Sequence, residues 1–179
     1  MVYVFLANGF EETEALVTVD LLRRAGLSVQ TVGIGGKTVC GSHGISVSAD
    51  VEDVDFVAKD TKAVVLPGGM PGTRHLEASP LVQDMLKSAV KENCFIAAIC
   101  AAPSVLGHAG LLSGKHATCY PGFESELIGA TVVPDAAVRD GNIITGKGAG
   151  AVFDFSFAII RALCGEEQAT TVKEAIQCK

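Results

Sequence analysis

The sequence predicts an α/β sandwich, in which helices cover both faces of a mostly parallel β-sheet. Short apolar stretches alternate with stretches of helical spacing along the whole chain, and this alternation is typical of βαβ units. One of these stretches, 63–66, contains no polar residue, as expected for a strand covered on both faces. A length of 179 residues, 49% of them hydrophobic, suits a single domain over 1–179.

The expected elements follow from the N-terminus onward. Residues 2–7 are apolar and β-rich, Asn8-Gly9 ends this strand, and 11–25 has helical spacing until Gly26 stops the helix. An Asp-Gly pair marks a hairpin turn within 138–144. By the same criteria, further strands are expected at 28–32, 63–66, 95–99 and 117–120, a small edge strand at 45–48, and further helices at 81–92, 101–109, 151–163 and 166–176.

Composition and charge narrow the class of protein. The formal net charge is −6 and the basic residues are spread along the chain, which argues against nucleic acid as the main partner. No apolar run suits a membrane span or a signal peptide, so no membrane partner is expected. The six cysteines show neither C-x-x-C pairs nor metal-ligand spacing, which indicates a reducing compartment. We expect a soluble cytoplasmic protein that needs no metal and no cofactor.

Cys100 lies where the apolar run 95–99 ends and a predicted helix begins. A nucleophile at such a junction occupies a sharp strand-to-helix turn, which requires small residues two positions before and after it, here Ala98 and Ala102. Backbone N–H groups at the start of a helix favour negative charge, so the sequence predicts a reactive, low-pKa thiolate. The alternative is a buried structural cysteine that packs as a small apolar residue.

An acidic loop is expected beside Cys100, because ligands of such sheets bind at the carboxyl ends of the strands. This loop carries Glu11, Glu12 and Glu14, and we expect Glu14 to turn inward while its neighbours face water. A desolvated Glu14 would stay protonated and donate a hydrogen bond to the thiolate. The alternative is that all three acids complement the helix N-terminus.

Backbone N–H groups are the expected oxyanion hole. Gly68 and Gly69 follow the strand 63–66 and allow backbone conformations that turn N–H groups towards a substrate oxygen. The N–H of Gly69, together with that of Ala101, would stabilise negative charge on that oxygen.

Four motifs, in this order, resemble those of the ThiJ/PfpI superfamily in its DJ-one branch. They are Gly9-Phe10-Glu11-Glu12-Thr13-Glu14-Ala15, Leu66-Pro67-Gly68-Gly69, Ala97-Ala98-Ile99-Cys100-Ala101-Ala102-Pro103 and Thr145-Gly146-Lys147-Gly148-Ala149-Gly150. The resemblance spans nearly the whole chain. It implies a flavodoxin-like three-layer sandwich of the class I glutamine amidotransferase type, usually a homodimer, with an oxidation-sensitive cysteine at Cys100 and a protonated glutamate at Glu14.

The chain departs from this family pattern after the elbow helix. Many relatives have a histidine before a proline there, whereas this chain has Cys119-Tyr120-Pro121. A tyrosine, with an ordinary pKa of about 10, is no general base at neutral pH. His116 lies four residues away, about 13 Å along a strand, and is not expected to substitute. A Cys-His dyad is therefore not expected, and Tyr120 is assigned a hydrogen bond to a substrate oxygen.

Two more pocket residues follow from the resemblance. Arg24 matches the second arginine of the family's Arg-Arg-Ala-Gly segment, and His43 lies where relatives carry an arginine between Ser42 and Gly44. Both are expected to approach the site from a dimer partner and to favour acidic or phosphorylated ligands; the alternative for both is solvated surface charge. Cys119 is a candidate resolving thiol for Cys100.

Three functions remain open. The first is a cofactor-independent cysteine enzyme, a glutathione-independent glyoxalase or protein deglycase, acting on reactive dicarbonyls such as methylglyoxal or on glycated protein. It would use the low-pKa thiolate of Cys100, assisted by Glu14. The second is a redox sensor or chaperone of oxidative stress, with Cys100 oxidised to sulfinate and little turnover. The third is a hydrolase, either a cysteine peptidase or an amidase.

Overall fold

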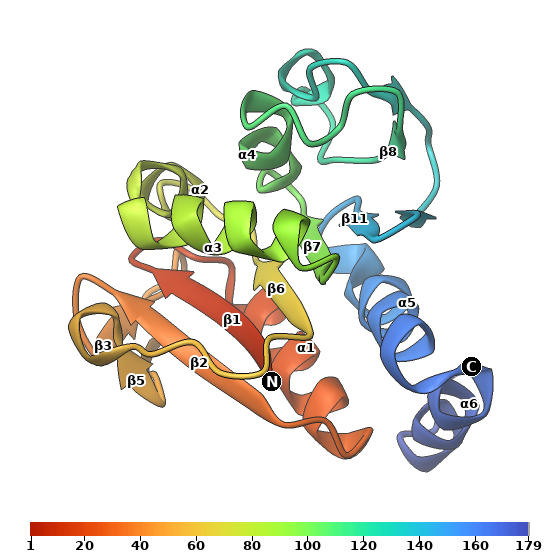
Figure 1. Ribbon diagram of the computed structural model, residues 1–179. Coiled ribbons are helices and arrows are strands. Elements are labelled where there is room, and N and C mark those ends of the chain that lie inside the picture. Colours follow the sequence, from red (N-terminus) through yellow and green to blue (C-terminus); the bar gives the residue numbers. More distant parts are fainter. Residues whose placement is uncertain (179) are drawn as a thin grey trace.

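A seven-stranded sheet runs through the centre of the computed structural model, which describes residues 1–178 (Figure 1). Across the sheet the strands are β10 (Ala137–Asp140), β11 (Ile143–Gly146), β7 (Phe95–Ile99), β6 (Ala63–Leu66), β1 (Val2–Ala7), β2 (Val29–Ile34) and β5 (Val51–Glu52). Every neighbouring pair is parallel except β10 and β11. The predicted α/β sandwich with a mostly parallel sheet is confirmed.

Strand β1 shows why the sheet is covered on both faces. Its side chains alternate, with Val2, Val4 and Leu6 in one core and Tyr3 and Phe5 in the other. The first core contains the helices α1 (Glu12–Arg24), α5 (Val152–Cys164) and α6 (Glu166–Ala175). The second contains α2 (Gly72–Ala78), α3 (Pro80–Lys91) and α4 (Pro103–His108).

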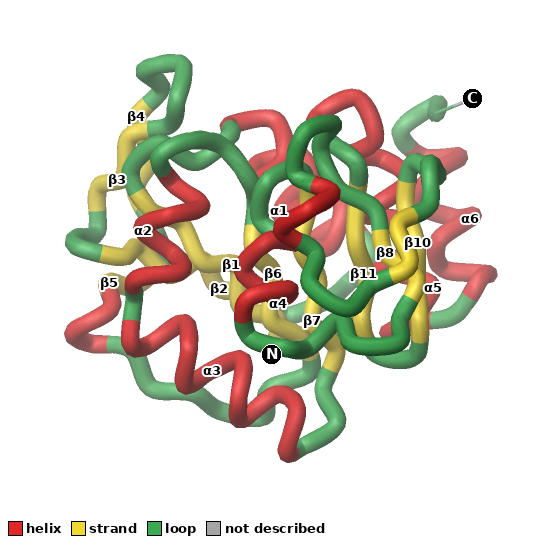
Figure 2. Tube along the Cα trace, turned by 90° about the horizontal axis from the view of Figure 1, so that it is seen from above, coloured by secondary structure: helices red, strands yellow, loops and turns green. Residues whose placement is uncertain are grey.

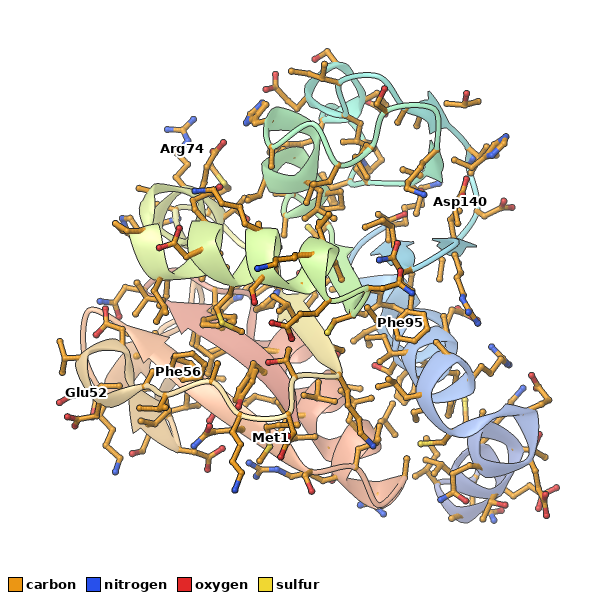
Figure 3. The ribbon with its side chains drawn as sticks, viewed as in Figure 1. Met1, Glu52, Phe56, Arg74, Phe95 and Asp140 are labelled. Atoms are coloured by element: carbon orange, nitrogen blue, oxygen red, sulfur yellow. The ribbon has the colours of Figure 1, made fainter. Side chains whose placement is uncertain are left out.

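The remaining elements are short. They are the hairpin of β3 (Thr38–Cys40) and β4 (Ser46–Ser48), the pair β8 (His116–Ala117) and β9 (Thr131–Val132), and the 3₁₀ turns η1 (Asp53–Asp55), η2 (Glu124–Glu126) and η3 (Ala149–Ala151). The hairpin projects from one side of the sheet in Figure 2. At the same end, Phe56 packs edge-on against Tyr3 with 4.9 Å between ring centroids, and Glu52 points outward at the periphery (Figure 3).

Three expectations need correction. The segment 45–48 was expected as an edge strand, but β4 pairs only with β3, outside the main sheet. The strand expected at 117–120 is instead β8 at His116–Ala117, because the N–H of Tyr120 donates to the carbonyl of Cys100 and not to a neighbouring strand. Helix α2 was missed, because its seven residues begin directly after Pro71 and are too few to show helical spacing.

Candidate functional site

Cys100 lies on the sharp turn between β7 and α4 that the sequence predicts. Its φ is 65°, a left-handed conformation that few residues other than glycine adopt. The turn is held on both sides, since the N–H of Cys100 donates to the carbonyl of Gly146 and its carbonyl accepts from the N–H of Tyr120, both at 2.9 Å. Ala98 and Ala102 are fully buried against this turn. The crowding explains why both residues are small.

Glu14 turns inward, as predicted, from the first turn of α1. The residue is 1% exposed, and its Oε2 accepts a hydrogen bond of 2.8 Å from the N–H of Gly68. Its Oε1 is buried and has no hydrogen-bond partner among the described residues. Glycine is required at 68, because an added Cβ would lie 2.6 Å from the Cβ of Cys100 and 2.7 Å from Oε2 of Glu14. The carboxyl and the thiol therefore meet across the space that a side chain would fill.

The two groups shift one another's protonation. Burial raises the pKa of Glu14 to about 7, although hydrogen bonds with Cys100 and the Gly68 N–H partly offset this effect. Burial also raises the pKa of Cys100 to about 12, and an ionised Glu14 beside the sulfur adds to this effect. The prediction that Cys100 ionises more readily than a free cysteine is wrong, because burial of the thiol, and then the charge of an ionised Glu14 beside it, both disfavour the thiolate.

The pair is best described as sharing one ionisable proton near neutral pH. Its first proton leaves near pH 7 and its second near pH 12. In the singly ionised pair the charge lies mainly on Glu14, and a minor form with the proton on the carboxyl carries the charge on sulfur. The backbone N–H groups of Ala101 and Gly69 both hydrogen-bond to the sulfur and lower the pKa of Cys100. These are the two N–H groups that the sequence predicts as an oxyanion hole. The backbone of Gly69 has a φ of 91°, a conformation that favours glycine.

Glu12 was expected to face water, and that expectation is wrong. The residue is 5% exposed, and its carboxylate accepts hydrogen bonds from the backbone N–H of His43 at 2.7 Å and from its Nδ1 at 2.9 Å. Burial opposes its ionisation, but the hydrogen bonds from His43 and Ile45 outweigh this cost and lower the pKa of Glu12 to about 2. In the sequence, Gly41 was a feature that could have indicated the burial of Glu12, because an added Cβ at residue 41 would collide with the Glu12 carboxyl. Glu12 thus fastens the start of α1 to the 41–45 loop.

One group of described residues has the composition of a metal site. One ligand atom each from Glu11, Glu12 and His43 lies within 4.8 Å of the others. Its oxygens are already used, however, since Glu11 caps α1 by accepting from the N–H of Glu14 at 2.7 Å and Glu12 accepts from His43. Hydrogen bonds of the protein account for this geometry without an ion.

Arg24 and His43 do not join Cys100 within this chain. Arg24 lies at the far end of α1, roughly 15 Å along the axis from Glu14, and pairs with Asp20 at 2.7 Å. His43 is held by Glu12, and its side chain is 71% exposed. The assignment of either residue to a pocket completed by a second chain stays a prediction.

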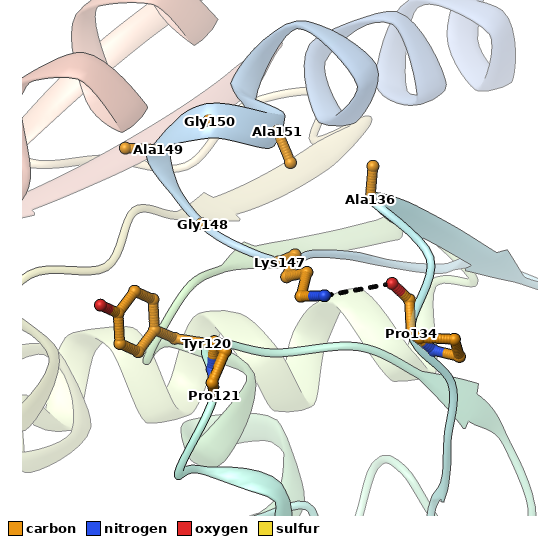
Figure 4. A pocket seen from close by; sticks show the side chains of 9 residues that line it. All are labelled: Tyr120, Pro121, Pro134, Ala136, Lys147, Gly148, Ala149, Gly150 and Ala151. Carbon is orange, nitrogen blue, oxygen red and sulfur yellow. Dashed lines mark hydrogen bonds between the residues drawn. The ribbon is translucent and has the colours of Figure 1, made fainter.

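The backbone N–H of Tyr120 donates to the carbonyl of Cys100, and the side chain of Tyr120 borders an open cavity (Figure 4). The residue is 51% exposed, and its ring covers Gly148, where an added Cβ would lie 3.2 Å away. His116 on β8 does not take the missing position, because its Nδ1 lies 3.5 Å from Oδ2 of Asp140 on β10. Cys119 is buried, and burial raises its pKa to about 11.

His108 is a residue of this region for which the sequence indicates no partner. Its Nδ1 lies 2.5 Å from Oε1 of Glu77 and its Nε2 lies 2.8 Å from Oε2 of Glu126. Only an imidazolium donates from both ring nitrogens, and the hydrogen bond with Glu77 raises the pKa of His108. The ring joins α2, α4 and η2, which follow Gly69, Cys100 and Tyr120 respectively. The partners are far apart in sequence, so no local pattern indicates them.

The chain was compared with known proteins and structures. The DJ-1/PfpI family model matches residues 1–162. Protein dj-1beta of Drosophila melanogaster is 38% identical over 176 residues, covering 97% of this chain and 94% of that protein. Its crystal structure superposes with a TM-score of 0.93 at 35% identity, over 99% of this chain and 97% of that one.

The names of two further matches state an activity and an oxidised form. Glutathione-independent glyoxalase DJR-1.2 of Caenorhabditis elegans is 33% identical over 164 residues, covering 90% of this chain and 87% of that protein. A structure of oxidized Toxoplasma gondii DJ-1 superposes with a TM-score of 0.94 at 31% identity, over 98% of this chain and 97% of that one. Among the described residues, no helix has the length and apolar character needed to cross a membrane.

Proposed function

The chain belongs to the DJ-1/PfpI family, and from that premise we propose that it is a glutathione-independent glyoxalase or deglycase with Cys100 as nucleophile. One observation carries the proposal. The carboxyl of Glu14 is buried beside the thiol, its Oε1 has no hydrogen-bond partner within residues 1–178, and its pKa is raised to about 7. A carboxyl that gains and loses a proton near neutral pH is suited to general acid–base catalysis.

The proposed reaction begins when the thiolate sulfur of Cys100 bonds to the aldehyde carbon of methylglyoxal. The carbonyl oxygen gains negative charge, which the N–H groups of Gly69 and Ala101 stabilise, and then takes the proton of Glu14 to give a hemithioacetal and a Glu14 carboxylate. Glu14 removes the hydrogen of the former aldehyde carbon as a proton, which returns to the neighbouring ketone carbon. The hydroxyl proton on the first carbon's oxygen moves to the ketone oxygen, so that the first carbon becomes a carbonyl and the second carries the hydroxyl. The first carbon is thereby oxidised and the second reduced, so no external oxidant is needed.

The product of this isomerisation is a lactoyl thioester on Cys100. Water hydrolyses it to lactate and restores the thiol, so that methylglyoxal and water together give lactic acid. The same nucleophile and carboxyl serve a deglycase, in which the sulfur attacks the hemiaminal carbon of an early protein adduct and the amine leaves with a proton. The relative named as a glutathione-independent glyoxalase supports this reading.

The proposal includes the assembly and the compartment, a homodimer in the cytoplasm. Leu16 on α1 and Phe153 on α5 are 39% and 41% exposed, and both helices pack in the same core. Exposed apolar side chains on neighbouring helices are typical of an interface. A second copy on this face would complete the pocket with Arg24 and His43, and sedimentation of the reduced protein tests the assembly.

The test of the activity measures methylglyoxal loss and lactate formation by the reduced protein in the absence of glutathione. Wild type should form lactate, whereas Cys100→Ser should not. Equal rates in the two proteins would reject Cys100 as the nucleophile. Cys94→Ser serves as the control, because Cys94 is a buried cysteine whose thiol donates to the carbonyl of Thr61, at the opposite end of the sheet.

A second candidate is a redox sensor in which Cys100 is oxidised to the sulfinate. The relative described as oxidized supports it, as do the N–H groups that face the sulfur. Peroxide treatment followed by peptide mass spectrometry tests it. Rapid oxidation confined to Cys100, in a protein that forms no lactate, would favour this candidate over the enzyme.

A further inference from the structure

A cavity of about 510 Å³ opens beside the turn that holds Cys100 (Figure 4). Its walls are largely apolar and include Pro121, Pro134, Ala136 and Ala151. Tyr120 borders it, and Lys147 lies in the middle of the lining side chains. This volume far exceeds what a three-carbon substrate such as methylglyoxal occupies.

The cavity lies next to the backbone turn that holds Cys100. The N–H of Cys100 donates to the carbonyl of Gly146, the residue before Lys147. A strand spacing of about 4.8 Å and one peptide step of about 3.8 Å place the Cα atoms of Cys100 and Lys147 within roughly 9 Å. On the other side, the N–H of Tyr120 donates to the carbonyl of Cys100. The backbones of Tyr120 and Lys147 therefore flank Cys100, so a substituent longer than a methyl group can reach the space between these two residues.

The ammonium group of Lys147 has unused hydrogen-bonding capacity. Its one hydrogen bond among the described residues is a long one, 3.4 Å to the carbonyl oxygen of Pro134, whereas an ammonium has three donors. No carboxylate of a described residue lies within 4.0 Å of it, since every ion pair found involves other cations. Glu124 lines the adjoining cavity, but its carboxylate accepts from the N–H of Gly122 at 2.7 Å.

We propose that Lys147 is a specificity-determining residue that binds the carboxylate or phosphate of a substrate larger than methylglyoxal. The substrate class is an α-oxoaldehyde, or its early adduct, with an apolar body and an anionic end. The apolar body packs against the prolines and alanines, while the anion forms a charge-assisted hydrogen bond with Lys147. This inference rests on the proposed function, because it names the substrate of the same site.

The test compares 4-carboxyphenylglyoxal with phenylglyoxal, which differ only in the carboxylate. In wild type, the ratio of kcat/KM for the charged to the uncharged compound should exceed that in Lys147→Met by about tenfold, the usual effect of a hydrogen bond to a charged group. Lys147→Arg should restore most of the ratio. Lys87→Met, which removes an exposed lysine of α3 paired with Asp84, should leave the ratio at its wild-type value. An unchanged ratio in Lys147→Met would overturn the inference.

Alkylation separates this inference from the proposed function, because it needs no turnover. The rates at which Cys100 reacts with N-(4-carboxyphenyl)maleimide and N-phenylmaleimide are followed by mass spectrometry. Lys147→Met should slow only the charged reagent. If it does so in a protein that forms no lactate, Lys147 binds anions and the glyoxalase proposal fails. Equal effects on both reagents would reject the role of Lys147, whether or not lactate is formed.

Discussion

Replacing Glu14 with glutamine tests whether the carboxyl holds the proton that Cys100 loses. Glutamine keeps the volume of the side chain, and its amide oxygen can still accept the hydrogen bond from the N–H of Gly68. What it removes is the titratable proton beside the sulfur. The reactivity of Cys100 should therefore change its dependence on pH while the turn itself stays intact.

The expected magnitude follows from the two pKa values. In wild type the pair loses its first proton near pH 7, because the pKa of Glu14 is raised to about 7. In Glu14→Gln the sulfur must ionise alone. An ordinary thiol has a pKa of about 8.5, and burial, the largest cause of the raised pKa of Cys100, persists in the variant. The midpoint should rise by at least about 1.5 pH units, which corresponds to about 2 kcal/mol.

Iodoacetamide alkylation measures this midpoint directly. The rate of Cys100 labelling is followed by mass spectrometry from pH 5 to pH 10 in both proteins, with Cys94 as an internal reference for a buried thiol. Wild type should reach a plateau above pH 7, and Glu14→Gln should still be rising at pH 9. A variant midpoint at or below that of wild type would refute the shared proton.

The other predictions concern stability. The pKa of Glu14 is about 7 in the folded protein and 4.5 ordinarily, so folding binds a proton between these values and the free energy of unfolding falls as pH rises from 4.5 to 7. Glu14→Gln lacks this loss, so its free energy of unfolding relative to wild type should be about 3 kcal/mol higher at pH 8 than at pH 4 in thermal unfolding. Parallel pH profiles of the two proteins would contradict this. The raised pKa of His108 stabilises the protein below its ordinary pKa and is lost as pH rises through the folded value, so His108→Gln should lower Tm more at pH 6 than at pH 9. Gly68→Ala, with a methyl carbon 2.6 Å from the Cβ of Cys100, should cost about 1–3 kcal/mol and abolish lactate formation; Gly150→Ala, with no heavy atom within 4 Å of the added carbon, is the stability control, and equal Tm values for the two variants would contradict the crowding.

The turn at Cys100 could be predicted because its signal is local. A strand-type run, a cysteine and two flanking alanines are consecutive in sequence, and they are sufficient to place a left-handed residue at the end of β7. The inward direction of Glu14 was also predicted correctly, from its position in the loop after the first strand.

The electrostatics of the site could not be predicted in the same way. Burial raises the pKa of Cys100, and the extent of that burial depends on how segments distant in sequence pack around the thiol. The helix N-terminus, considered alone, indicated a lowered pKa. Glu12 was misplaced for a related reason, because its hydrogen-bond donors lie in the loop around His43. His108 likewise depends on Glu77, 31 residues away in the chain. Buried charges are fixed by such distant partners, which leave no periodic pattern.

The central claim is that a buried carboxyl stays protonated beside Cys100 up to neutral pH, and the titration of Glu14 itself tests it most directly. Carbon-13 NMR of protein labelled at the glutamate carboxyl, with Glu14→Gln to assign the signal, gives the midpoint. We predict a midpoint of about 7 in the reduced protein. A midpoint near the ordinary value of 4.5 would mean that Glu14 is already ionised when the thiol reacts, and it would contradict the account.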